Sequence, residues 1–113
     1  MKTICVPVNA SAQQRLDYDE CLEDDLISMD MDNETCYQLF ELGVFNKINK
    51  MAGCIIDDFE DDRITDTGKL KTILNSGLFN ENIYSPEINN LITKIKNLFD
   101  EALKRNTGVY FYF

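Results

Sequence analysis

The stretch SPEINNLITKIKNLFDEALKRNTGVYFYF, residues 85–113, holds the clearest secondary-structure signals in the chain. Ser85, Pro86 and Glu87 supply a helix N-cap, a proline at the first helical position and an acid in the first turn. Apolar residues then recur at helical spacing and form one stripe: Ile88, Leu91, Ile92, Ile95, Leu98, Phe99 and Ala102. The stretch therefore predicts a long amphipathic helix that ends at residues 106–108, followed by a strand at residues 109–113.

This last strand needs a partner, because an unpaired VYFYF segment of high β-propensity favours aggregation. Its natural partner is KTICVPV at residues 2–8, a β-branched and apolar segment in which Pro7 suits an edge strand or a strand end. If Val109, Phe111 and Phe113 face the core, the alternating pattern turns Tyr110 and Tyr112 outward. We expect these two strands to form a small sheet.

Helical spacing and capping residues predict four more helices between the two strands. Residues 9–14 are small and polar and are predicted to be a loop. The expected helices begin at residue 17 or 19, 33, 44 and about 67, and end near residues 29, 43, 53 and 77. With 113 residues, the chain is predicted to be a single α+β domain spanning residues 1–113. About five helices would pack on a small sheet formed by the N- and C-terminal strands.

The charge of the chain is strongly negative and unevenly distributed. There are 20 acids, 11 bases and no histidine, for a net charge of −9. Residues 1–66 carry 16 of the acids and 5 of the bases, whereas residues 67–113 are slightly basic. Such a field repels nucleic acid and anionic membranes and speeds the encounter with cationic partners. The composition therefore indicates a basic protein partner, and neither nucleic acid nor membrane.

The stretch GCIIDDFEDDRI, residues 53–64, runs from an apolar anchor into five carboxylates in six positions. Its acids could engage lysine and arginine side chains of a partner in place of phosphate, with an aromatic residue as a central anchor. A second acid-rich stretch lies within residues 17–25 and could extend the same surface. The candidate partner-binding residues are Asp57, Asp58, Phe59, Glu60, Asp61, Asp62, Tyr18, Asp19, Glu23 and Asp24. The alternative is that residues 57–62 form a solvated loop whose charges only keep the protein soluble. Phe59 would then be a core residue that anchors this loop.

Metal binding and catalysis find little support in these residues. Calcium loops of the EF-hand kind require a glycine at position 6, and the two acidic registers have Thr35 and Arg63 there. The sequence has neither the histidines nor the closely spaced cysteine pairs that zinc sites use. It also contains no motif for a catalytic nucleophile or for nucleotide binding. We therefore predict no catalytic residue, metal or cofactor. The alternative is a small-ligand-binding protein, or a carboxylate-based hydrolase with an enclosed pocket.

The four cysteines, Cys5, Cys21, Cys36 and Cys54, are spaced too widely for a CxxC unit and each has apolar neighbours. We predict that they are reduced core residues. Residues 1–8 are too short and too polar-flanked for a signal peptide, and no apolar run reaches the length of a membrane span. A cytoplasmic location follows. The rival interpretation is a secreted domain stapled by disulfides, supported by the even cysteine count.

Residues 45–49, FNKIN, and residues 53–64, GCIIDDFEDDRI, followed by an amphipathic helix and a terminal aromatic strand, resemble bacterial immunity proteins of toxin–immunity systems. This group includes the immunity proteins of contact-dependent growth inhibition. The resemblance covers about residues 45–74 and the general architecture. It implies a cytoplasmic inhibitor that binds one cognate toxin domain, often a cationic nuclease, and blocks its active site or an adjoining surface. No catalytic residue is implied.

Overall fold

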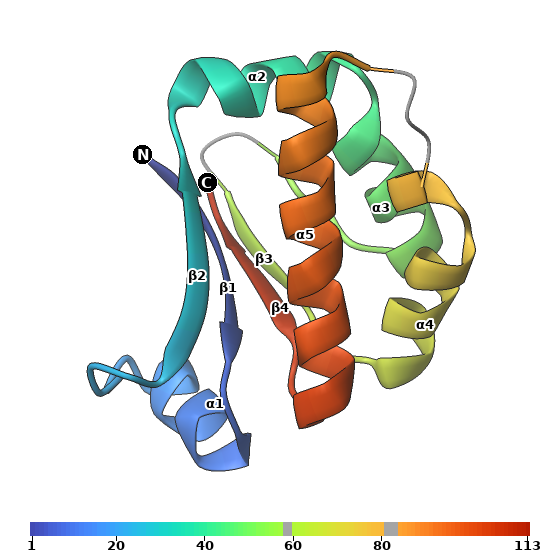
Figure 1. Cartoon of the computed structure of the whole chain (residues 1–113). Helices are drawn as coiled ribbons and strands as arrows, with labels where there is room; N and C mark the ends of the chain where they lie inside the picture. The colour runs from blue at the N-terminus through green and yellow to red at the C-terminus, as the bar shows by residue number, and fades with distance from the viewer. Residues whose placement is uncertain (58–59, 81–83) are drawn as a thin grey trace.

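The centre of the structure is a four-stranded antiparallel sheet, seen in a computed structural model that describes residues 1–57, 60–80 and 84–113 (Figure 1). The strand order is β2-β1-β4-β3. The strands are β1 (Lys2–Pro7), β2 (Leu26–Met31), β3 (Asp61–Ile64) and β4 (Val109–Tyr112). β1 pairs with β4, with Thr3 opposite Tyr112 and Cys5 opposite Tyr110. The predicted pairing of the first and last strands is confirmed, and these two strands form the middle of the sheet.

Four helices cover one face of this sheet, and a fifth lies against the other. The covering helices are α2 (Asn33–Glu41), α3 (Val44–Ala52), α4 (Thr67–Asn75) and α5 (Pro86–Arg105), with the short 3₁₀ helix η1 (Leu78–Asn80) after α4. α5 runs along the sheet in front of the strands (Figure 1). The remaining helix, α1 (Ala10–Asp17), contacts the opposite face, where its Gln13 and Asp17 side chains reach Tyr110. The predicted class, α+β with five helices on a sheet that includes both terminal strands, is confirmed for the described residues.

The core between the sheet and α2–α5 is rich in phenylalanine. Phe45, Phe99 and Phe111 are fully buried and come from α3, α5 and β4. The ring of Phe45 lies 4.7 Å from that of Phe40 and 5.2 Å from that of Phe113, centroid to centroid. As the alternating pattern of the last strand predicted, Val109, Phe111 and Phe113 belong to this core.

Local capping explains why four helices lie where the sequence predicted them. Asp32, Asp66 and Ser85 are the N-caps of α2, α4 and α5, and each side chain accepts a hydrogen bond from a backbone N–H three residues on. Gly53 ends α3 in the left-handed conformation, with φ of 64°.

The prediction for residues 9–31 is wrong. Residues predicted as a loop form α1, because the Asn9 side chain caps the helix by accepting from the Ala12 N–H at 2.8 Å. Part of the predicted helix between residues 17 and 29 is instead β2, since Leu26 to Met31 pair along their whole length with β1. The spacing of Leu22, Leu26 and Met29 fits a helix, but the pairing with β1 decides the outcome.

The structure decides between two alternatives for the first strand and corrects a prediction for another segment. Pro7 suited an edge strand or a strand end, and it is the last residue of β1, which is a central strand. The Pro7 carbonyl accepts a hydrogen bond from the Thr107 hydroxyl at 2.8 Å. At this end of β1, a side-chain hydroxyl therefore takes the place of a backbone N–H donor. Residues 61–64 form β3, which the low β-propensity of DDRI did not indicate. The sheet is thus larger than the two predicted strands.

The cysteines agree with the prediction only in part. All four are free thiols; Cys5 and Cys36 are buried and Cys54 is half-buried, whereas Cys21 is exposed in the segment after α1 and is not a core residue. Within residues 1–57, 60–80 and 84–113, no helix has both the length and the apolar character needed to cross a membrane.

Candidate functional site

The sheet face opposite α2–α5 carries an open hollow that gathers acids from both acid-rich stretches. Its volume is about 390 Å³. It lies between the end of α1 and the strands β3 and β4. Its lining residues are Leu16, Asp17, Asp19, Asp61, Asp62, Arg63, Tyr110 and Tyr112. Four acidic residues and one arginine thus contribute to the lining of one hollow.

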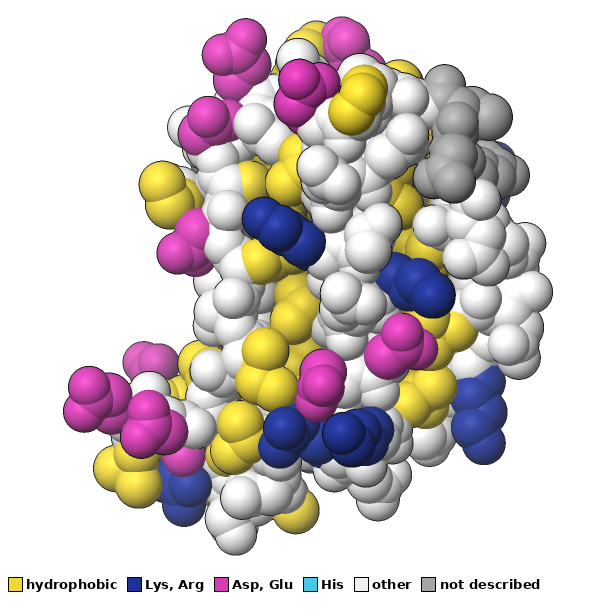
Figure 2. Space-filling view, in the orientation of Figure 1, with side chains coloured by type: hydrophobic (Ala, Val, Ile, Leu, Met, Phe, Trp, Pro, Cys, Tyr) yellow, Lys and Arg dark blue, Asp and Glu magenta, His cyan; other side chains and the backbone are white. Residues whose placement is uncertain are grey.

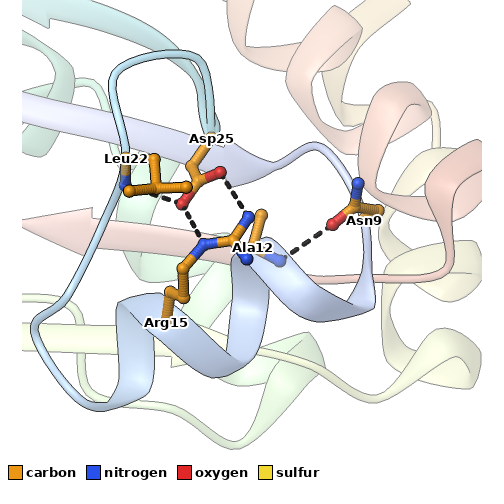
Figure 3. Close-up of polar contacts among 5 residues, drawn as sticks. All are labelled: Asn9, Ala12, Arg15, Leu22 and Asp25. Carbon is orange, nitrogen blue, oxygen red and sulfur yellow. Dashed lines mark hydrogen bonds and ion pairs between the residues drawn. The ribbon is translucent and has the colours of Figure 1, made fainter.

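An ion pair holds the first acidic stretch in place (Figure 3). Arg15 of α1 donates to both carboxylate oxygens of Asp25 at 2.6 and 2.7 Å, and the Leu22 N–H donates to Asp25 at 2.8 Å. The Arg15 guanidinium, followed by the Leu22 N–H, lowers the pKa of Asp25 to about 2. The Asp25 side chain is 7% exposed. These contacts close residues 18–25 into a loop tied to α1 and to the start of β2.

The second acidic stretch is anchored through Asn49 of α3. The Asn49 side chain accepts from the Ile56 N–H at 2.7 Å and donates to the Ile56 carbonyl at 2.9 Å. The next turn is fixed by Asp62, which accepts from the Ile55 N–H at 2.6 Å. Because Asn49 is itself on a packed helix, it sets the position of the chain that leads into β3. Sequence reasoning missed this role, and an asparagine in an amphipathic helix gives no signal for it.

The floor of the hollow consists of Tyr110 and Tyr112, whose rings stack with centroids 6.4 Å apart. Tyr110 is 3% exposed; its hydroxyl donates to Asp17 at 3.2 Å and accepts from the Gln13 amide at 3.3 Å. Burial raises the pKa of both phenols. Tyr112 lies nearer the open part of the face and is half-buried. The outward alternation predicted for these two tyrosines is confirmed, although α1 covers Tyr110.

Arg63 is the cation of the hollow. Its guanidinium donates to Asp17 at 2.7 Å and lies 5.7 Å from the centroid of the Tyr110 ring. One arginine therefore neutralises Asp17, and Asp19 and Asp61 remain as exposed acids that line the hollow with Tyr112. Asp17 and Arg63 were not among the predicted site residues, since their contact depends on the pairing of β3 with β4.

The predicted site residues divide into three groups. Asp19, Asp61 and Asp62 line the hollow, although the Asp62 carboxylate is occupied by the N–H groups of Ile55 and Arg63. Asp57 and Glu60 form a bridge at the turn before β3 and are exposed, while Asp58 and Phe59 lie outside the described residues. Tyr18, Glu23 and Asp24 are exposed on the loop after α1, outside the lining of the hollow.

The opposite side of the molecule differs in charge. Figure 2 shows the face covered by helices, where Lys and Arg side chains lie over α5 and α4. Acidic side chains gather in the same view at the loop between α1 and β2 and around α2. The charge asymmetry along the sequence therefore becomes an asymmetry in space.

The described residues contain no group of three or more histidine, cysteine, aspartate or glutamate side chains arranged to hold a metal ion. No protein-family model matches the chain, and searches of curated proteins and of solved structures find no match.

Proposed function

We propose that this protein is an immunity-type inhibitor in the bacterial cytoplasm. It binds one cognate basic toxin domain, in our proposal a nuclease of a contact-dependent growth inhibition system. The acidic face neutralises the toxin by occluding its active-site region with complementary charge.

The observation that carries this proposal is that Asp19, Asp61 and Tyr112 line the same hollow. These acids come from separate acid-rich stretches, and both are exposed at one hollow. Bringing like charges together costs stability, and a cationic partner would relieve that cost. Exposed carboxylates can pair with lysine or arginine side chains that otherwise hold phosphate. Tyr112 adds the aromatic surface that is enriched at the centre of protein interfaces.

The electrostatic field of the whole chain supports the same assignment. With a net charge of −9, the protein attracts cationic proteins and repels nucleic acid, so it would compete with the substrate of a nuclease without binding that substrate itself. Rapid association is what an inhibitor of a lethal enzyme requires, and electrostatic steering supplies it.

The test is co-purification of the tagged protein from a lysate of its own source at low and high salt, with mass spectrometry of the eluate. We expect one basic polypeptide, released as salt rises, and encoded directly upstream as part of a larger toxin gene. The double variant Asp19→Asn/Asp61→Asn should weaken its binding about tenfold or more. Asparagine suits position 19, where φ is 59°.

The matched control is Glu87→Gln/Asp100→Asn, which removes the same charge from exposed positions of α5, on the opposite face. It should leave binding within about twofold at 0.15 M salt, because separated surface charges are screened. Equal losses in the two variants would reduce the role of the hollow to net charge. An eluate without a basic polypeptide would contradict the proposal and favour the small-ligand or hydrolase alternative.

A further inference from the structure

Strand β2 forms one edge of the sheet and has a free side. β1 pairs with it along all six residues, from Lys2 opposite Met31 to Pro7 opposite Leu26. No other strand in the described part of the chain pairs with β2. In Figure 1, β2 is the outermost strand of the sheet, and no helix lies along its outer edge.

The register shows which backbone groups point away from the sheet. The Val8 N–H donates to the Asp25 carbonyl at 2.9 Å, so position 25 faces β1. Hydrogen-bonded pairs alternate in an antiparallel ladder, and Ile27, Met29 and Met31 therefore also bond toward β1. The N–H and C=O groups of Leu26, Ser28 and Asp30 must point outward. The Thr107 hydroxyl bond to the Pro7 carbonyl agrees, since it places the odd positions of β1 toward β4.

The free edge lacks two of the usual protections against strand addition, proline and lysine. β2 contains neither proline nor lysine, and it is regular over six residues. Ile27 and Met29 pack against the core and fix the strand in register. The other edge, β3, is only four residues long, and its Asp62 side chain is bonded to the Ile55 N–H. Of the two edges, β2 is the one that offers a continuous template.

The acids around β2 select its occupant. Asp30 is exposed on the strand, with Glu23 and Asp24 before it and Asp32 and Glu34 after it. A second copy paired antiparallel about Ser28 would set Asp24 of one molecule opposite Asp32 of the other, which is unfavourable. A strand with lysine or arginine at alternate positions would instead face these carboxylates with opposite charge.

We infer that the free edge of β2 binds an extended, basic segment of a protein partner by strand addition. The outward N–H and C=O groups of Leu26, Ser28 and Asp30 supply the backbone hydrogen bonds, and the flanking acids select for positive charge. The identification of that segment with part of the toxin rests on the proposed function; the edge itself does not.

The decisive variant is Ser28→Pro, because it removes an outward N–H and leaves the bonds to β1 intact. Ser28→Ala is the matched control, since it removes the hydroxyl and keeps the N–H. The probe is a synthetic nine-residue peptide that alternates lysine with valine or threonine, and the control peptide has glutamate in place of lysine. Binding is measured by calorimetry, and amide hydrogen exchange by NMR locates the site.

In the free protein, the amides of Leu26, Ser28 and Asp30 should exchange quickly and those of Ile27 and Met29 slowly. The lysine peptide should protect the first three, and the glutamate peptide should not bind. Ser28→Pro should weaken binding of the lysine peptide about tenfold or more at unchanged melting temperature, while Ser28→Ala binds like the parent.

Unchanged binding by a folded Ser28→Pro variant, or protection confined to β3 and β4, would overturn strand addition. If Ser28→Pro fails to fold, fast exchange and peptide protection of the three outward amides in the parent protein still decide the question. The two proposals fail separately. A basic polypeptide captured equally by Ser28→Pro would retain the inhibitor proposal, and peptide binding at β2 without any captured polypeptide would retain the edge site alone.

Discussion

Asp25 is the single residue on which the position of the first acidic loop depends. Its bonds from Arg15 and from the Leu22 N–H exist only in the folded chain, and they lower the pKa of its carboxyl group from 3.8 to about 2. A carboxyl group with a lowered pKa in the folded state stabilises that state above pH 3.8, and this contribution is lost as the pH falls through about 2.

Asp25→Asn should therefore lower the melting temperature at pH 6, and the difference from the parent protein should shrink between pH 4 and pH 2. Calorimetric scans of both proteins at a series of pH values measure it. Asp100→Asn, at an exposed position of α5, is the control and should show little difference at any pH. A difference for Asp25→Asn that is constant with pH would mean that the Arg15 ion pair contributes nothing.

Gly108, just before β4, lies close to the backbone at the end of β3 and at the residue after it. A Cβ there would lie 2.7 Å from the Ile64 carbonyl oxygen and 3.2 Å from the Thr65 Cα, both backbone atoms that can give way only if β3 moves. We expect Gly108→Ala to lower the free energy of unfolding by about 1–3 kcal/mol in urea titrations. Asn97→Ala, at an exposed position of α5, should stay within about 0.5 kcal/mol of the parent protein.

At the scale of elements, α5 depends on its first turn as well as on its buried face. The Ser85 hydroxyl accepts from the Ile88 N–H, which would otherwise lack a partner within the helix. Ser85→Ala should lower the free energy of unfolding by about 1 kcal/mol. Ser85→Asp keeps an acceptor and adds a negative charge at the helix N-terminus, so it should retain the stability of the parent. Chemical denaturation of the three proteins checks the order.

The elements also show how far the sequence could predict this fold. α2, α3, α4 and α5 depend on caps and on apolar stripes within their own residues, such as Asp32 and Ser85, and these signals are local. β2 and β3 depend on pairing with β1 and β4, and local sequence signals do not show that residues 26–31 and 61–64 pair with those two predicted strands. DDRI has low β-propensity, and it is a strand because Arg63 and Ile64 lie opposite Tyr110 and Val109.

The candidate site, like the fold, could be predicted from the sequence only where the signals are local. Composition and clustering identified Asp19 and Asp61 as surface acids, and in the structure these two residues, one from each stretch, line the same hollow. Their role in binding a partner stays a prediction. Asp17 and Arg63 could not be predicted as site residues, because their 2.7 Å ion pair joins α1 to β3 and the sequence indicated neither element at these positions.

For the molecule as a whole, stability depends on the phenylalanine cluster that joins the helices to the sheet. Phe45 is fully buried and contacts the rings of Phe40, Phe111 and Phe113. Phe45→Ala should lower the free energy of unfolding by about 3–5 kcal/mol, a large part of the 5–15 kcal/mol typical of a domain. Tyr37→Ala, an aromatic side chain that is 62% exposed, should change it by less than about 0.5 kcal/mol. Urea unfolding measures both, and similar losses would place Phe45 outside the cooperative core.

The strand order also governs when the protein can fold during its synthesis. β4 lies between β1 and β3, and its residues are translated more than a hundred positions after β1 begins. In a nascent chain that has not yet released Val109–Tyr112 from the ribosome, β1 and β2 can pair, but β3 has no strand to pair with and the helices lack the central strand β4 to pack against. We expect the native sheet to close only after translation of its last-made strand, so the newly made molecule passes through a stage in which it cannot yet present the assembled acidic face.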